Sequence, residues 1–120
     1  MRYSKYFKIK DFDGSATHIK ATAYYDKGGY NVFTYENKPR GYYLSFTPVT
    51  REIHEYDGGK TYTSESFIAF TGKGTLVSEV GRASNKKYAE VKQYLNDYAE
   101  QFIHHWFPQY DVEFEFDREE

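Results

Sequence analysis

The chain offers three groups of residues that could do chemistry: tyrosines, a glycine-rich loop and an acidic C-terminal run. It has 14 tyrosines among 120 residues, and aromatic residues make up 21% of it. Tyr24-Tyr25 and Tyr42-Tyr43 would place one ring on each side of a strand, so a single core cannot take both rings of a pair. Exposed tyrosine is typical of protein-binding surfaces, because the ring gives rigid contact area and the hydroxyl a hydrogen bond. The alternative is that the rings only complete a two-sided sheet. The predicted protein-binding aromatic face consists of Tyr24, Tyr30, Tyr35, Tyr43, Tyr56 and Tyr62.

The glycine-rich loop is the segment Thr71-Gly72-Lys73-Gly74-Thr75. The spacing of Leu76, Val77 and Val80 predicts a short helix that begins after Gly74 and ends near Gly81. Free N–H groups at such a helix start, together with a lysine, can hold a phosphate or carboxylate. The alternative is an ordinary strand-to-helix turn, because the full P-loop signature is absent. The candidate anion-binding residues are Gly72, Lys73, Gly74 and Thr75.

The C-terminal run is strongly acidic, with six carboxylates from Asp111 to Glu120 against Arg118 alone. The acidic residues Asp111, Glu113, Glu115 and Asp117 alternate with aromatic and aliphatic ones. This alternation predicts a last strand with its aromatic face in the core and its acidic face in water. The carboxylates would then protect a sheet edge from aggregation. The alternative is that they imitate nucleic-acid phosphates toward a basic groove on a partner.

Catalytic and metal-binding patterns are missing from the sequence. The absence of cysteine excludes disulfides and cysteine-ligated metals. The histidines His18, His54, His104 and His105 match no known ligand spacing. No nucleophile motif is present. Glu52 and His54 could form an acid–base pair, but we interpret them as part of a solvated loop. We therefore expect no enzyme activity, no metal and no cofactor.

Cations interleaved with aromatic residues suggest one further alternative, a single-stranded nucleic-acid binder that uses the aromatic sheet face. The residues concerned are Lys8, Lys10, Lys20, Lys38 and Arg40. The net charge of −2 argues against this alternative, because nucleic-acid-binding domains usually carry a strongly basic patch.

The elements that must position these residues are mainly strands. Alternating patterns predict five of them before any helix, at Tyr3–Lys10, Ser15–Tyr25, Tyr30–Tyr35, Tyr42–Ile53 and Thr61–Phe70. Turns are expected at Asp11–Gly14, Asp26–Gly29 and Asp57–Lys60, and a looser loop at Glu36–Gly41. Pro48 indicates that its strand is at an edge or is interrupted by a bulge.

A long amphipathic helix follows, with Ser84 as its N-cap and Pro108 just past its end. Its apolar positions are Tyr88, Val91, Leu95, Tyr98, Ala99, Phe102 and Trp106. The predicted order is β-β-β-β-β-α-α-β. This indicates a single α+β domain over residues 1–120, with a five-to-six-stranded, mainly antiparallel sheet and the long helix packed on one face. No apolar run is long enough to span a membrane, and no signal peptide is visible, so we expect a cytoplasmic protein.

Three stretches resemble a pattern found in small proteins of bacterial phages and other mobile elements: Lys27-Gly28-Gly29-Tyr30-Asn31, Arg40-Gly41-Tyr42-Tyr43-Leu44-Ser45 and Glu65–Gly72. The resemblance covers about half of the chain, carries no catalytic motif and implies the cytoplasm of a bacterial host. It implies a small accessory protein, such as a counter-defence inhibitor of the anti-CRISPR kind. Together with the tyrosines, it predicts a non-enzymatic protein-binding module whose partner is another protein or a second copy of the chain. The alternative is a small-ligand or nucleotide binder that uses the Gly72–Gly74 loop.

Overall fold

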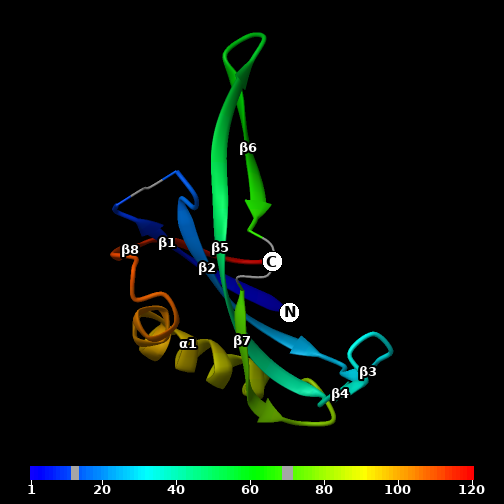
Figure 1. Cartoon of the computed structure of the whole chain (residues 1–120). Coiled ribbons are helices and arrows are strands. Elements are labelled where there is room, and N and C mark those ends of the chain that lie inside the picture. Colours follow the sequence, from blue (N-terminus) through cyan, green and yellow to red (C-terminus); the bar gives the residue numbers. More distant parts are fainter. Residues whose placement is uncertain (12–13, 69–71) are drawn as a thin grey trace.

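The computed structural model describes residues 1–11, 14–68 and 72–120 of the chain (Figure 1). The predicted turn at Asp11–Gly14 lies partly outside these residues, as do Ala69 and Phe70 of the predicted fifth strand and Thr71 of the glycine-rich loop. The elements are β1 (Arg2–Ile9), β2 (His18–Asp26), β3 (Gly29–Asn31), β4 (Glu36–Lys38), β5 (Gly41–Tyr56), β6 (Lys60–Phe67), β7 (Lys73–Glu79), α1 (Asn85–Trp106) and β8 (Val112–Glu119).

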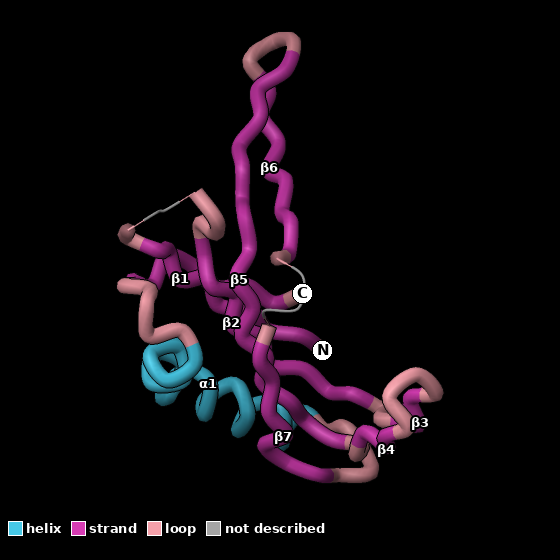
Figure 2. Tube along the Cα trace, viewed as in Figure 1, coloured by secondary structure: helices cyan, strands magenta, loops and turns pink. Residues whose placement is uncertain are grey.

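The predicted α+β architecture is confirmed. One six-stranded sheet has the order β6-β5-β2-β1-β8, with β7 paired to β5 beside β6, and all of these pairs are antiparallel. The helix α1 covers one face of this sheet, and the β3–β4 hairpin stands apart as a second, two-stranded sheet (Figure 2). The other face of the large sheet, here called the open face, is therefore left without a helix.

Alternation along the strands decides which residues face α1. In β2, Ile19, Ala21 and Ala23 are buried on the helix side, whereas Lys20 and Thr22 are buried on the open face. The core lies between the sheet and α1, and much of it is aromatic, because large rings fill the space that the small β2 side chains leave. Its buried members are Tyr3, Phe7, Ile9, Ala16, Ile19, Ala21, Ala23, Tyr42, Leu44, Phe46, Tyr88, Val91, Leu95, Ala99, Ile103, Phe107 and Val112.

The strand β5 is the backbone of the sheet because it pairs with three others. Residues 41–49 pair with β2 on one side, while the other side pairs with β7 over residues 41–46 and with β6 over residues 49–56. Pro48 is buried inside this strand, not at an edge or a bulge as expected. It lies where the partner changes from β7 to β6, so its missing N–H costs no ladder bond. Beyond β2, the β5–β6 hairpin projects alone (Figure 1); residues 52–64 are called the arm below.

The long helix forms as predicted. The hydroxyl of Ser84 accepts a hydrogen bond from the N–H of Lys87 at 3.1 Å, and the helix ends at Trp106, two residues before Pro108. Ser84 is also fixed from the sheet, because its N–H donates to the Tyr42 hydroxyl and that hydroxyl donates to the Ser84 carbonyl. The start of α1 is thereby attached to β5.

Two predicted elements are wrong. The expected short helix after Gly74 is the strand β7, because the edge of β5 at Gly41–Phe46 offers backbone partners that a helix would leave unused. The expected strand Tyr30–Tyr35 and the loop after it form the β3–β4 hairpin instead. Its turn is held by Asn31, whose side-chain oxygen accepts from the N–H of Phe33 at 2.9 Å.

Candidate functional site

The six predicted face tyrosines do not share one surface. Tyr24 and Tyr43 stack on the open face with ring centroids 5.8 Å apart, and Tyr43 is buried. The other four are exposed: Tyr30 and Tyr35 on the β3–β4 hairpin, and Tyr56 and Tyr62 on the arm. The prediction of one continuous aromatic face is therefore wrong. The four exposed tyrosine rings nevertheless lie outside the core.

The arm carries a small aromatic cluster. The ring of Tyr62 stacks on His54 at 4.8 Å and lies 5.9 Å from Tyr56. Ile53, on the other side of the strand, is 75% exposed. The arm is two-stranded, so neither of its faces is covered by the rest of the sheet, and each presents apolar side chains to solvent.

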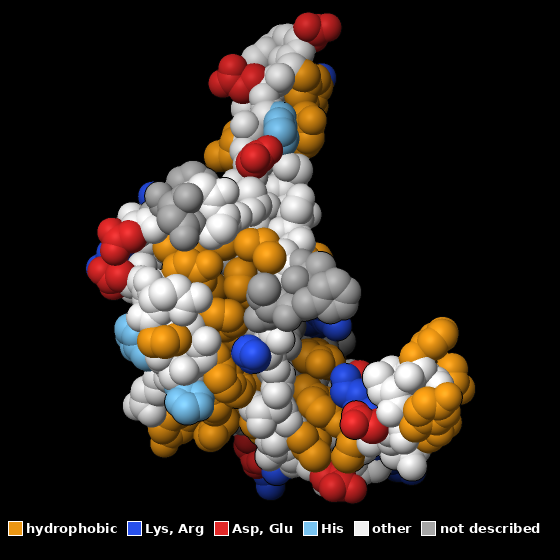
Figure 3. Space-filling model, viewed as in Figure 1, with side chains coloured by type: hydrophobic (Ala, Val, Ile, Leu, Met, Phe, Trp, Pro, Cys, Tyr) orange, Lys and Arg blue, Asp and Glu red, His pale blue; other side chains and the backbone are white. Residues whose placement is uncertain are grey.

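The β3–β4 hairpin presents a second apolar surface. Phe33 is 89% exposed and Tyr35 is 80% exposed, with Val32 beside them. Figure 3 shows hydrophobic side chains gathered at the outer end of this hairpin. Tyr35 has a positive φ of 57°, an uncommon conformation for a non-glycine residue, so the tight turn holds its ring outward at a backbone cost.

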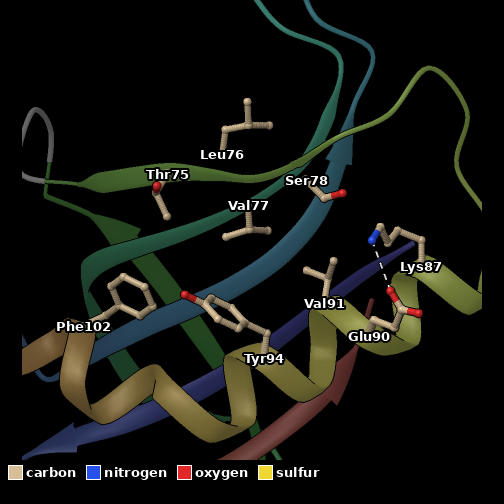
Figure 4. Close-up of a pocket in the computed structure, with 9 residues that line it drawn as sticks. All are labelled: Thr75, Leu76, Val77, Ser78, Lys87, Glu90, Val91, Tyr94 and Phe102. Atoms are coloured by element: carbon tan, nitrogen blue, oxygen red, sulfur yellow. Dashed lines mark hydrogen bonds and ion pairs between the residues drawn. The ribbon is translucent and has the colours of Figure 1, made fainter.

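A hollow lies between β7 and α1. It has a volume of about 500 Å³, and Val77 of β7 faces Val91 and Tyr94 of α1 across it (Figure 4). Phe102 closes one end, with its ring 6.1 Å from that of Tyr94. Lys87 and Glu90 stand at the other end, joined at 3.2 Å. This hollow, called the β7–α1 groove below, is apolar in its middle and charged at one end.

The groove continues along the outer side of the helix. Tyr94 and Tyr98 are 40% and 42% exposed, and their rings lie 4.9 Å apart. The aromatic row then runs through Phe102 to Trp106, with 5.3 Å between these two rings. The sequence pattern assigned Tyr98, Phe102 and Trp106 to the buried face of α1, which is correct only in part. The four-residue spacing from Tyr94 to Trp106, beside the separate row of buried residues, was the available signal for a second apolar stripe.

The outer edge of β7 borders this groove. Within the described residues β7 pairs with β5 alone, and a bulge opposite Tyr42 and Tyr43 places Val77 as an extra residue in β7. A strand directs its N–H and C=O groups to both sides, so β7 keeps backbone groups that β5 does not satisfy. The Gly72–Thr75 segment starts this strand, so the helix N-terminus proposed to bind an anion there does not exist.

The acidic side chains of β8 are exposed to solvent, as expected, but they also contact neighbouring residues. Asp117 accepts from the Tyr3 hydroxyl at 2.6 Å, and Glu115 contacts His18 Nε2 at 3.0 Å. Asp111 and Glu113 both lie 3.9 Å from the ammonium group of Lys10. Phe116 leaves the core because of a bulge in the β1–β8 pairing, and stacks on Tyr6 across the open face at 4.5 Å.

The open face contains an ionic cluster around the buried Lys20. Lys20 Nζ lies 3.4 Å from Glu65 and 3.2 Å from Glu120, and Arg118 binds Glu120 at 3.1 Å. The buried Tyr6 hydroxyl accepts from Arg118 at 2.8 Å. Burial, and then the nearby Glu65, raise the pKa of Tyr6, so its phenol stays neutral.

The cations expected to follow nucleic-acid phosphates are mostly engaged within the chain. Lys20 is in the ionic cluster, Lys10 contacts β8, and Lys38 binds Asp26 at 2.9 Å. Arg40 donates to the backbone carbonyl of Lys27 at 2.9 Å. The described residues contain no cluster of histidine and acidic side chains that could hold a metal ion. Within the same residues, no helix has the length and apolarity that crossing a membrane requires.

No protein-family model matches this chain, and no curated protein or solved structure shows significant similarity to it. Its function is therefore inferred from the chemistry of its own surfaces.

Proposed function

We propose that this chain is a non-enzymatic protein-binding module that takes an extended segment of a partner protein into the β7–α1 groove. The observation that supports this most directly is that β7 pairs with β5 alone within the described residues and borders a groove of about 500 Å³ with an apolar middle. An added strand would satisfy the free backbone groups of β7, while its side chains would enter the groove. Strand addition beside a helix is an established mode of peptide recognition.

The dimensions suit such a segment. The seven residues of β7 extend over about 23 Å at roughly 3.3 Å per residue, which allows pairing with a partner stretch of about four to six residues. Alternate side chains of that stretch would point to the apolar middle of the groove, at Val77, Val91 and Tyr94. Lys87 and Glu90 at the charged end would favour a polar residue there. We therefore expect a partner segment in which apolar residues alternate with others.

The projecting hairpins would add contacts with a full-length partner, away from the groove that a short peptide occupies. The arm and the β3–β4 hairpin expose Ile53, Phe33 and Tyr35 by three-quarters or more. Aromatic residues at such positions are enriched in protein interfaces. The resemblance to phage and mobile-element proteins makes a bacterial defence protein the first partner class to screen, with a second copy of this chain as the alternative.

A peptide-display selection on the purified protein tests this proposal. We expect enrichment of peptides with apolar residues at alternate positions, and protection of β7 amides from hydrogen exchange when such a peptide binds. Methylation of alternate peptide nitrogens should abolish binding in one register only, because only every second N–H would pair with β7.

Two matched variants locate the binding surface. Tyr94→Ala removes an exposed ring from the groove, and Tyr62→Ala removes a similarly exposed ring from the arm. We expect Tyr94→Ala to weaken peptide binding at least tenfold and Tyr62→Ala to leave it nearly unchanged. Strand addition is refuted if no peptide is enriched, if both nitrogen registers tolerate methylation, or if bound peptides protect the arm and not β7.

A further inference from the structure

A second hollow, of about 340 Å³, lies on the open face of the sheet, away from the β7–α1 groove. Its floor consists of hydroxyl-bearing residues of β2 and β5, namely Thr22, Ser45 and Thr47. Thr22 and Ser45 are direct cross-strand partners, and Thr47 pairs with Lys20. Short side chains are therefore grouped here between larger neighbours, which leaves room above them.

Two cations border the hollow. Lys20 is 8% exposed and stands at the end nearest the ionic cluster. Arg2 stands at the side formed by β1, with its guanidinium carbon 5.0 Å from the ring centre of Tyr24. Arg2 has no ion pair within the described residues, in contrast to Lys20. Its positive charge is therefore available to a ligand.

The carboxylates near the hollow are already occupied. Both oxygens of Asp26 are used, one by the N–H of Gly28 at 2.7 Å and one by Lys38 at 2.9 Å. Lys38, and then Gly28, lower the pKa of Asp26, so it stays ionised and paired. Glu65 and Glu120 belong to the ionic cluster with Lys20. No carboxylate is thus left to hold a cation here.

The hydroxyl groups of the hollow, like its cations, favour a ligand with negatively charged oxygen atoms. Ser45 and Thr47 have no side-chain hydrogen bond in the described part of the chain, although both line the hollow and are half-buried. Each can donate one hydrogen bond to an oxygen atom of a ligand. Together with the guanidinium of Arg2 they form a set of unused donors directed at one space.

The local charge has the opposite sign to that of the whole chain. The charged residues that line the hollow are Arg2 and Lys20 against Asp26, a formal excess of one positive charge. The chain as a whole has a net charge of −2. A phosphate monoester carries about −1.5 to −2 at neutral pH, so its charge is opposite in sign to that of the hollow.

We propose that this hollow is a binding site for a phosphate group, in which Arg2 and the hydroxyls of Ser45 and Thr47 hold the phosphate oxygens and Lys20 lies at its inner end. Known small-molecule sites begin at about 300 Å³, so the space accommodates a phosphate with a small organic part. The ligand is therefore either inorganic phosphate or a small phosphomonoester. The site shares no lining residue with the β7–α1 groove and stands independently of the proposed function.

Titration followed by amide NMR tests the site. Inorganic phosphate and glycerol phosphate are the two probes, and sodium chloride of equal ionic strength is the control. We expect both phosphates, and not chloride, to shift the amides of Thr22, Ser45 and Thr47. Tighter binding of glycerol phosphate would identify a phosphomonoester as the ligand class, and equal binding would identify the free anion.

Two variants with matched controls complete the test. Arg2→Gln removes the positive charge, and Thr47→Val removes the hydroxyl at nearly constant shape; we expect each to weaken phosphate binding about tenfold or more. Arg82→Gln and Thr63→Val make the same changes at exposed positions away from the hollow and should bind as the parent does. The site is refuted if chloride gives the same shifts as phosphate, or if Arg2→Gln and Thr47→Val bind phosphate like their controls.

Discussion

The phenol of Tyr3 should make the folded state lose stability in alkaline solution. Its oxygen lies 2.6 Å from Asp117 Oδ2 and 3.1 Å from Asn96 Oδ1, and the residue is only 7% exposed. Burial, followed by the hydrogen bond to Asp117, raises the pKa of Tyr3 from 10.0 to about 12. The neutral phenol is thus favoured in the folded state. Its contribution to stability is complete below pH 10 and is lost as the pH rises through 12.

The size of the effect follows from this shift. A difference of about two pKa units corresponds to roughly 2.7 kcal/mol of unfolding free energy in total, because each unit is worth about 1.4 kcal/mol. At about pH 11 the unfolded phenol is mostly ionised and the folded one mostly neutral, so about half of the total, roughly 1.4 kcal/mol, is lost there. Tyr88 also has a raised pKa, because of burial and its hydrogen bond to Glu119. A comparison of two proteins that both contain Tyr88 cancels its contribution.

The assay is urea unfolding of the parent and of Tyr3→Phe at several pH values between neutrality and about 11. At neutral pH the variant should be less stable by about 1 kcal/mol, because it loses one hydrogen bond while Asp117 stays hydrated. The gap should close as the pH approaches 11, because only the parent loses the stabilisation. A gap that stays constant over this range would show that Tyr3 ionises at its ordinary pKa, and the reasoning would be wrong.

Three further predictions concern the helix, the strand pairing and the acidic strand. Leu95→Ala should lower the unfolding free energy by about 2 to 5 kcal/mol, since this side chain is fully buried, whereas Tyr94→Ala should cost much less in the same urea unfolding assay. Gly41→Ala should detach β7, because its new Cβ would collide with the carbonyl oxygen of Ser78, and faster hydrogen exchange confined to β7 and its β5 partners would show this. The hydrogen bond from Lys92, followed by that from Tyr88, lowers the pKa of Glu119; its stabilisation is therefore present above about pH 4.5 and lost as the pH falls. Glu119→Gln should accordingly flatten the acid side of the stability profile, and an unchanged profile would contradict the assignment.

The main architecture could be predicted because its signals are local. Alternation defines β1, β2 and most of β5, and paired glycines with positive φ mark the turn at Gly58-Gly59. The helix is set by Ser84 and a long three-to-four-residue repeat. The strand β7 was not predicted, because Leu76, Val77 and Val80 form an apolar run that is too short for its periodicity to distinguish a strand from a helix. This segment forms a strand because it pairs with the free edge of β5, which lies roughly 30 residues earlier in the chain.

The candidate sites could be predicted less well, because register and bulges determine them. Tyr43 was expected on an exposed face, but its pairing opposite Tyr24 and Leu76 buries it. Glu115 and Asp117 are exposed as expected, but their contacts with His18 and Tyr3, which depend on the register of the β1–β8 pairing, could not be predicted. Residues that lie far apart in the chain meet in both cases, and no pattern within one segment contains that information. Only the surplus of tyrosine rings was visible from composition alone.

The position of α1 explains why an apolar groove persists on this protein. The helix packs over β2 and β5 through one row of residues that includes Val91 and Leu95. β7 extends the sheet beyond that row, so Tyr94 faces β7 across the groove (Figure 4). Phe102 and Trp106, further along the helix, pack against Phe46 of β5. Fold stability alone would be served equally well by polar residues in place of Tyr94 and Tyr98, because the core is complete without these two. Exposed rings beside an unpaired strand edge favour aggregation unless something covers them. A partner segment in the groove would cover these rings and also form hydrogen bonds with the strand edge. For this reason we place recognition in the groove and not on the arm.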